Sequence, residues 1–364
     1  MDNLQIAECI EKLFSSITDN YIFVYTPPKV GSTTLVTSLR ISLGRSYNVI
    51  HIHDEIMLSV LTGINNVKIN DIINFLSGQG KNVYVIDVYR TPIERKMSEF
   101  FEKISCHHFN NTEENISKYS IKRISNRFNK LFPHLENGDH YFEQYNIDNP
   151  IPFDFINKFT LQLINNVKYI KLRLCDSNIW SDILTNIFKS EIVIIYDYNT
   201  ENKCIGYLYK RFKQEYRLPI NFFELIKECK YLNFYYDETE RNNYINYWSN
   251  KLSNDFFTPY TKSEYNFYMN LCLENQYIND IQNEHYIDNG CFCNYCTKKR
   301  KDIFFKAKSG VKVFEKIIHR EVINEVKNEK INKINDKLKN VINGYISKQK
   351  FKPKQFKINV LSKP

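Results

Sequence analysis

Near its N-terminus the chain runs from a short aromatic and β-branched segment into a loop and then a helix, an order that strongly constrains the fold. The segment Tyr21–Tyr25 is typical of a buried strand, and Thr26–Pro28 ends it. Apolar residues then recur at helical spacing over Leu35–Leu43, with Gly44 as the expected stop. A strand followed closely by a helix is the building unit of α/β proteins, and the N–H groups at such a helix N-terminus attract phosphate.

Further runs of the same kind predict more strands, each separated from the next by helical sequence. Buried strands that alternate with helices favour a doubly wound sheet, so we expect a three-layer α/β sandwich with a central parallel sheet. A mainly helical appendage should follow it. The predicted strands are Asn48–Ile52, Val83–Tyr89, Val167–Leu172 and Ile192–Tyr196, and the predicted helices include Leu4–Ile17, Pro92–Ile104 and Ile317–Ile346.

The length of 364 residues allows one large α/β domain with an appendage, or two domains. We place the α/β domain at residues 1–255 and a helical, basic, cysteine-containing region at residues 256–364. Thr297–Pro364 holds 20 lysines and arginines against six acidic residues, whereas the preceding residues hold 30 against 35. This basic excess indicates either a solvated helical face or a surface for an anionic partner.

The loop after the first predicted strand, Pro28–Thr34, reads P-K-V-G-S-T-T. In the Walker pattern the lysine follows the second glycine, whereas Lys29 precedes Gly31, so an ordinary ATPase or kinase is disfavoured. The loop instead resembles the 5′-phosphosulfate loop of the sulfotransferase superfamily, P-K-x-G-[ST]-[ST]. A second pattern of that superfamily, R-x-P-x-x-R-x-x-S-x-F, matches Arg90–Phe100, directly after the predicted strand Val83–Tyr89.

This resemblance implies a P-loop-type fold and the sulfuryl donor 3′-phosphoadenosine-5′-phosphosulfate (PAPS). Lys29 would contact the leaving phosphate oxygen, while Arg90 and Ser98 would hold the 3′-phosphate. More narrowly, Asp87–Lys96 is similar to the capsular polysaccharide synthesis protein family, which implies a carbohydrate hydroxyl in a capsule or surface polysaccharide as acceptor. The other loop residues expected to contact the donor are Pro28, Val30, Gly31, Ser32, Thr33 and Thr34.

Transfer to a hydroxyl requires a general base. His51 and His53 fall on one face at the carboxyl end of the strand Asn48–Ile52, where open α/β sheets bind their ligands. We rank His53 first, Glu55 second and His51 third, because members of the superfamily use a histidine or a glutamate in this region. His107–His108 is a further candidate pair. For each of these histidines, a structural role is the alternative.

A second group of chemistry-bearing residues lies far along the chain. Cys291, Cys293 and Cys296 have C-x-C and C-x-x-C spacing, and Gly290 would allow a sharp turn before them. Thiolates at this spacing can converge on a tetrahedral structural Zn²⁺, which needs a fourth ligand. Free thiols and a disulfide or redox pair are the alternatives. The candidates for the fourth ligand are His285, Cys272 and His319.

Two other classes of function stay open from the sequence. One is a P-loop kinase that acts on a sugar or a nucleotide, and the other is a binding or assembly protein that keeps the fold without catalysis. The basic cluster Lys298–Lys301 could contact phosphate, nucleic acid or an anionic glycan, but no nucleic-acid-binding signature accompanies it, so we expect no nucleic-acid partner. The helix Ile317–Ile346 would pack on the main body or form a homo-oligomer.

The location of the protein follows from what the chain lacks. No run of about 18 apolar residues is present, and Met1–Cys9 is acidic and polar. We therefore expect no membrane span and no secretory signal, and infer a cytoplasmic protein.

Overall fold

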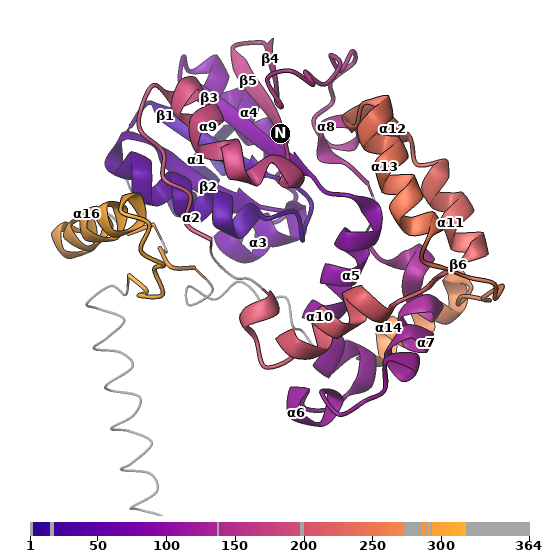
Figure 1. Ribbon diagram of the computed structural model, residues 1–364. Coiled ribbons are helices and arrows are strands. Elements are labelled where there is room, and N and C mark those ends of the chain that lie inside the picture. The colour runs from indigo at the N-terminus through magenta and orange to yellow at the C-terminus, as the bar shows by residue number, and fades with distance from the viewer. Residues whose placement is uncertain are drawn as a thin grey trace, which may run out of the picture. The chain divides into compact units, whose positions relative to one another are not determined.

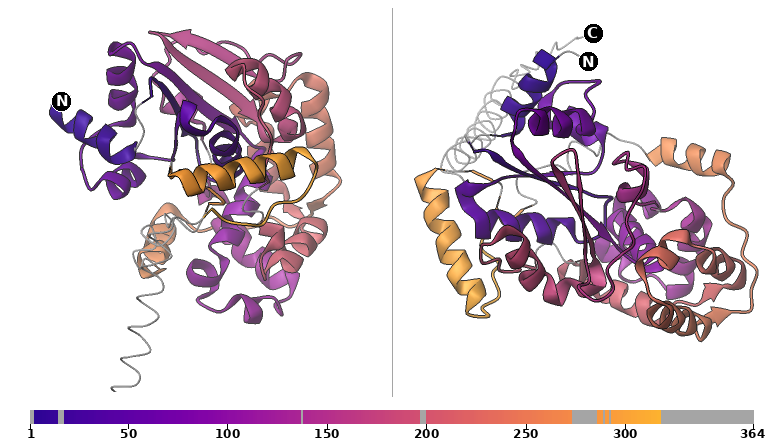
Figure 2. Two further views of the ribbon diagram at one scale, coloured as in Figure 1. Left: turned by 90° about the vertical axis from the view of Figure 1, so that its left-hand side faces the viewer. Right: turned by 90° about the horizontal axis from the view of Figure 1, so that it is seen from above.

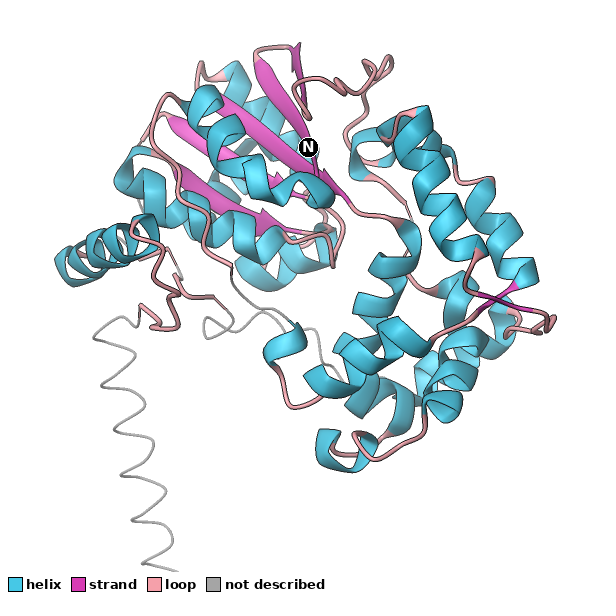
Figure 3. Cartoon of the chain, viewed as in Figure 1, coloured by secondary structure: helices cyan, strands magenta, loops and turns pink. Residues whose placement is uncertain are grey.

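The computed structural model describes residues 3–14, 18–136, 138–196, 200–272, 286–288, 290–291 and 293–317. All of these belong to the first of two units, residues 1–317, and residues 318–364 form the second. The described residues contain a five-stranded sheet in the order β2-β1-β3-β5-β4, with helices on both faces (Figures 1 and 3). Its strands are β1 (Asn20–Tyr25), β2 (Asn48–Ile52), β3 (Asn82–Tyr89), β4 (Thr160–Ile164) and β5 (Val167–Arg173).

The sheet is mixed, which corrects the prediction of a parallel one. β2, β1, β3 and β5 run parallel to one another, but β4 pairs antiparallel with β5 at the edge. Asn165 and Asn166, between these two strands, have φ angles of 48° and 63°, which suit a tight hairpin turn. The chain is therefore an α/β protein whose sheet is mostly parallel.

Residues alternate between the two faces of the sheet. In β1, Tyr21, Phe23 and Tyr25 pack with helices α1 (Asn3–Leu13), α3 (Glu55–Thr62) and α4 (Ile69–Gly78). Ile22 and Val24 face the other way, toward α2 (Ser32–Leu43) and α9 (Trp180–Phe188). This period of two fixes the register, because a shift of one residue would reverse every buried side chain.

The predicted strand Ile192–Tyr196 is wrong, since the segment has no sheet partner in the described part of the chain. It runs along α2, where the backbone N–H of Val193 donates to Ser42 Oγ at 3.0 Å and that of Ile195 to Ser38 Oγ at 2.9 Å. Serine hydroxyls of a helix thus satisfy the backbone groups that a neighbouring strand would otherwise bind.

A second, mostly helical core adjoins the sheet and is rich in aromatic rings, among them Phe100, Phe128 and Trp248. No helix in the described ranges is long and apolar enough to cross a membrane. The predicted first helix ends at Leu13, and the predicted helix Ile317–Ile346 falls outside the described residues. The remaining elements are α5 (Pro92–Glu102), α6 (Glu113–Ile116), α7 (Ile121–Leu131), α8 (His140–Glu143), α10 (Gly206–Glu215), β6 (Leu218–Pro219), α11 (Ile220–Lys227), α12 (Lys230–Tyr235), α13 (Glu238–Ser249), β7 (Leu252–Ser253), α14 (Lys262–Cys272) and α16 (Asn294–Lys308).

A buried charge network joins the sheet to α12. Lys171 of β5 lies between two carboxylates: its Nζ is 2.6 Å from Asp87 Oδ2 of β3 and also contacts Asp139, and all three side chains are buried. Thr26 Oγ1, after β1, donates to Asp87 Oδ1 at 2.6 Å, and the Tyr235 hydroxyl of α12 donates to Asp139 Oδ1 at 2.8 Å. Burial alone would raise the pKa of Asp87, but the Lys171 ammonium holds it below its usual value.

Removing the central cation should therefore be costly. We expect Lys171→Met to lower the free energy of unfolding by about 3–5 kcal/mol, because two buried carboxylates lose their shared counter-ion. Urea denaturation measures this loss. The matched control is Lys168→Met on the same strand. The Lys168 ammonium contacts the uncharged Tyr84 ring and hydroxyl, so this change should cost less than about 1 kcal/mol. Equal losses in the two variants would contradict the role of the network.

Candidate functional site

The loop between β1 and α2 has the backbone geometry of an anion-binding turn. Lys29 and Gly31 have left-handed φ angles of 66° and 91°, and α2 begins directly afterwards at Ser32. A Cβ atom on Gly31 would lie 2.7 Å from Leu174 Cδ1 and 3.5 Å from the Trp180 ring, so glycine fits both the angle and the space. The first N–H groups of α2 therefore meet the loop at a point where an anion would be stabilised.

The side chain of Lys29 is held at this loop by an acidic partner. Its Nζ lies 3.2 Å from Glu102 Oε2 at the end of α5, and Lys203 Nζ lies 2.8 Å from the same oxygen. Burial lowers the pKa of Lys29, and the Glu102 carboxylate opposes that effect. The site therefore contains two ammonium groups gathered around one carboxylate.

The two sequence motifs meet through hydrogen bonds from arginines to backbone carbonyls. Arg90 Nη1 donates to the Lys29 carbonyl at 2.8 Å, and Arg95 Nε donates to the Pro28 carbonyl at 3.3 Å. Arg95 is nearly fully buried and also pairs with Glu136 at 2.7 Å. Arg90 and Arg95 therefore both bind the loop between β1 and α2.

A narrow hollow of about 10 Å³, room for about one water molecule, lies beside Arg90 and is lined in part by Tyr89, Arg95 and Tyr231. Ser98 is not among the residues that line it and is buried within α5. Lys96 is also buried: its Nζ donates to the Leu135 carbonyl at 2.6 Å, and burial lowers its pKa to about 8. Of the second motif, Arg90, Pro92 and Arg95 line this hollow.

The first-ranked base, His53, lies just after β2, and one of its ring nitrogens is hydrogen-bonded to the backbone. His53 Nδ1 lies 2.6 Å from the Thr26 carbonyl, which can only accept, so Nδ1 carries the proton and Nε2 keeps its lone pair. Burial lowers the pKa of His53 to about 4, so the ring is neutral near pH 7. The His51 ring lies 4.4 Å from it, and His51 Nδ1 is hydrogen-bonded to the Tyr286 hydroxyl at 2.6 Å. A neutral imidazole with a lone pair on Nε2 can accept a proton.

The other candidate bases differ in their surroundings. Glu55 is the first residue of α3 and is partly exposed. His108 is buried in the helical core, where its ring stacks on Phe100 at 4.6 Å and burial holds its pKa well below the usual value. This environment favours the structural alternative for His108.

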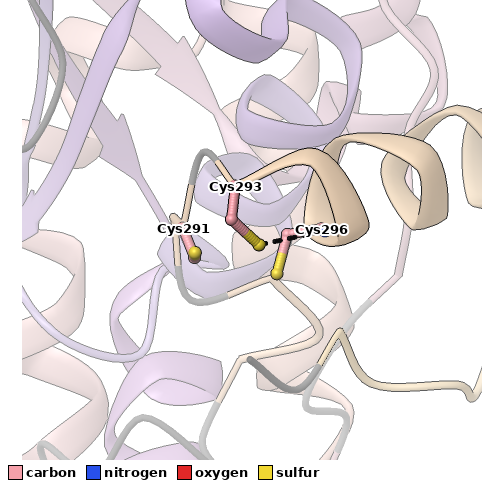
Figure 4. A group of neighbouring side chains, drawn as sticks. All are labelled: Cys291, Cys293 and Cys296. Atoms are coloured by element: carbon pink, nitrogen blue, oxygen red, sulfur yellow. Dashed lines mark hydrogen bonds between the residues drawn. The ribbon is translucent and has the colours of Figure 1, made fainter. Parts of the chain in front are cut away.

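The three clustered cysteines lie together at the start of α16 (Figure 4). Their sulfur atoms are all within 4.8 Å of one another, an arrangement that could hold a metal ion. The backbone N–H of Cys296 donates to Cys293 Sγ at 3.4 Å and lowers the pKa of Cys293, whereas burial raises the pKa of Cys296. His285, His319 and the side chain of Cys272, the candidate fourth ligands, lie outside the described residues.

No family model, curated protein or solved structure matches this chain. Its function must therefore be inferred from its own residues. Three residues at the candidate site were not predicted from the sequence: Glu102, Lys203 and Tyr286. Only Glu102 had a local signal, because it follows Ser98 by four residues and so shares its helix face.

The environment of His53 predicts how stability depends on pH. A histidine whose pKa is about 4 when folded and about 6.5 when unfolded binds more protons in the unfolded state, so stability falls as the pH drops from about 6.5 to about 4. In His53→Gln, an amide N–H can still donate to the Thr26 carbonyl but does not titrate. Between pH 6.5 and pH 4 the free energy of unfolding should fall by about 1–2 kcal/mol less in this variant than in the wild type. Urea denaturation at several pH values measures the difference. Identical pH profiles would contradict this environment.

Proposed function

We propose that this protein is a PAPS-dependent sulfotransferase that transfers a sulfuryl group to a carbohydrate hydroxyl in the synthesis of a capsule or surface polysaccharide. The observation that carries the proposal is the hydrogen bond from Arg90 to the carbonyl of Lys29. It joins two motifs about 60 residues apart, each of which resembles one half of a PAPS site. An accidental match of either motif would not require their residues to meet.

The loop and α2 offer the groups that the 5′-phosphosulfate end of the donor needs. The N-terminus of α2 supplies backbone N–H groups, and Ser32–Thr34 supply hydroxyls. Lys29 would move from Glu102 to the bridging oxygen of the donor. Arg90, whose guanidinium already reaches the Lys29 carbonyl, would bind the 3′-phosphate.

The reaction is an in-line displacement at sulfur. The acceptor oxygen forms a bond to sulfur as the bond from sulfur to the 5′-phosphate oxygen breaks, and the departing oxygen keeps the bonding electrons. Lys29 stabilises the negative charge that develops there, and the hydroxyl proton passes to the base. His53 Nε2 suits this last role, because the Thr26 carbonyl holds the proton on Nδ1. Glu55 remains the second candidate and His51, bound to Tyr286, the third.

Sulfuryl transfer is the direct test. Purified protein should transfer label from PAPS to members of a panel of neutral and amino-sugar oligosaccharides, and Lys29→Ala should lower turnover by roughly 10²–10³ because the leaving oxygen loses its counter-charge. The matched control is Lys81→Ala, which removes a lysine next to the amino end of β3 and should leave turnover unchanged. Full activity in Lys29→Ala would refute the assignment.

Nucleotide binding distinguishes a sulfotransferase from a kinase and from a binding or assembly protein. The product 3′-phosphoadenosine-5′-phosphate should raise the melting temperature, since a ligand at 100 times its Kd adds about 2.7 kcal/mol, and Arg90→Ala should weaken that effect. Stabilisation by ATP alone would indicate a kinase. Binding of the 3′-phosphorylated product without any transfer would indicate a binding or assembly protein.

We also propose that Cys291, Cys293 and Cys296 hold a structural Zn²⁺. Zinc–sulfur bonds of about 2.3 Å in a tetrahedron place sulfur atoms about 3.8 Å apart, so the observed cluster needs only a small contraction. Binding would displace up to three thiol protons to solvent. Arg300 supports this role, because its guanidinium donates to the Cys291 carbonyl at 2.6 Å and adds positive charge near the thiolates.

Metal content tests this proposal directly. We expect about one zinc per chain by mass spectrometry of the purified protein, and much less in Cys296→Ser, which removes the buried ligand. The control is Cys204→Ser, which removes an exposed thiol outside the cluster. A metal-free wild type purified with zinc present throughout would contradict the proposal.

A further inference from the structure

The segment just before the thiols contacts the end of β2. The Tyr286 hydroxyl is hydrogen-bonded to His51 Nδ1 at 2.6 Å, and the two rings meet edge to face at 5.8 Å. Arg40 of α2 lies over the Tyr286 ring at 5.2 Å. A residue near the end of the described chain thus fixes the orientation of a histidine that lies 4.4 Å from His53.

Asp288 anchors this segment on two sides. Its carboxylate pairs with Arg300 of α16, at 2.5 and 2.9 Å, and both side chains are buried. Its carbonyl accepts from Arg40 Nη1 at 2.9 Å, and the same guanidinium donates to the Val49 carbonyl of β2 at 3.1 and 3.2 Å. Asp288 therefore ties α16 to α2 and β2 in one polar cluster.

The three thiols lie at the other end of the same cluster. Arg300 donates to the Cys291 carbonyl as well as to Asp288, and Gly290, with a φ of 89°, turns the chain between them. Cys296 is buried beside Ile41 of α2, and Figure 2 shows α16 alongside the α/β body. A metal bound by all three sulfurs would connect the turn at Cys291 to the first turn of α16 by bonds far stronger than hydrogen bonds between thiols.

We propose that Zn²⁺ held by Cys291, Cys293 and Cys296 fixes the position of the segment that carries Tyr286, and so holds the Tyr286 hydroxyl in contact with His51. Tyr286 is then a positioning residue for the His51–His53 pair. The metal fixes the turn and α16, the Asp288–Arg300 pair transmits that position, and Tyr286 completes the contact with His51. Any effect on turnover rests on the proposed sulfotransferase function, whereas the effect on the contact itself does not.

The test compares zinc-loaded full-length protein with the same protein after removal of the metal by a thiophilic chelator. Two readouts need no substrate: hydrogen exchange of the backbone at residues 286–288 and 48–52, and the NMR signals of the His51 ring. Zinc removal should speed exchange at residues 286–288 by at least tenfold and shift the His51 signals in the direction that Tyr286→Phe shifts them. Restoring zinc should reverse both changes. Cys204→Ser should resemble the wild type in every measurement.

The opposite results would overturn the inference. If Tyr286→Phe shifts the His51 signals and zinc removal does not, the metal does not fix the position of Tyr286. A cluster that takes up no zinc, or that instead forms a disulfide, overturns it as well. Because Cys296→Ser removes a buried side chain and could unfold locally, the reversible removal of zinc from the wild type carries the test.

Turnover gives a separate readout. Zinc removal should lower kcat and leave the KM for PAPS unchanged. An absence of any transfer by the wild type would refute the proposed function, and the structural readouts would still decide the role of the metal.

Discussion

The candidate site depends on a lysine that is buried between two carboxylates. Lys171 pairs with both Asp87 and Asp139, and Asp87 also accepts a hydrogen bond from the Thr26 hydroxyl at the end of β1. The carbonyl of Thr26 in turn holds the proton of His53 on Nδ1. An ion pair in the middle of the sheet is thus connected, through one threonine, to the protonation state of the best candidate base. The same network reaches Tyr235, so it also joins the sheet to α12.

Local sequence signals predicted the elements that carry the motifs. The β1, β2, β3 and β5 strands and the helices α2 and α5 lie close to their predicted bounds, because β-branched runs, prolines and glycines mark them directly. Ile192–Tyr196 was mistaken for a strand because a short apolar run has the same pattern whether its backbone bonds to a strand or to serines of a helix. The antiparallel strand β4 was missed, since Leu161 and Leu163 occupy its exposed positions while Thr160 and Gln162 occupy inner ones, the reverse of the usual pattern.

The site was predictable to the extent that its residues are close in sequence. The loop of Lys29 and the strand end at Arg90 were found from spacing, and their contact is consistent with that interpretation. Lys203 lies 101 residues from its partner Glu102, and Tyr286 lies 235 residues from His51. No periodicity links residues so far apart, because tertiary packing alone brings them together. The cysteine cluster is the opposite case, since its six-residue spacing by itself required the thiols to be near one another.

The pairing of Lys29 with Glu102 bears on how such a site would discriminate among anions. Lys29 is buried deeply enough for its pKa to be lowered, and Glu102 is the partner that opposes this effect. An incoming phosphosulfate must replace that carboxylate as the counter-ion of Lys29, while Lys203 remains available to keep Glu102 neutralised. A weakly charged ligand would not repay the loss of the existing ion pair in a partly desolvated site. The arrangement therefore favours a ligand that brings several negative charges to the N-terminus of α2 at once.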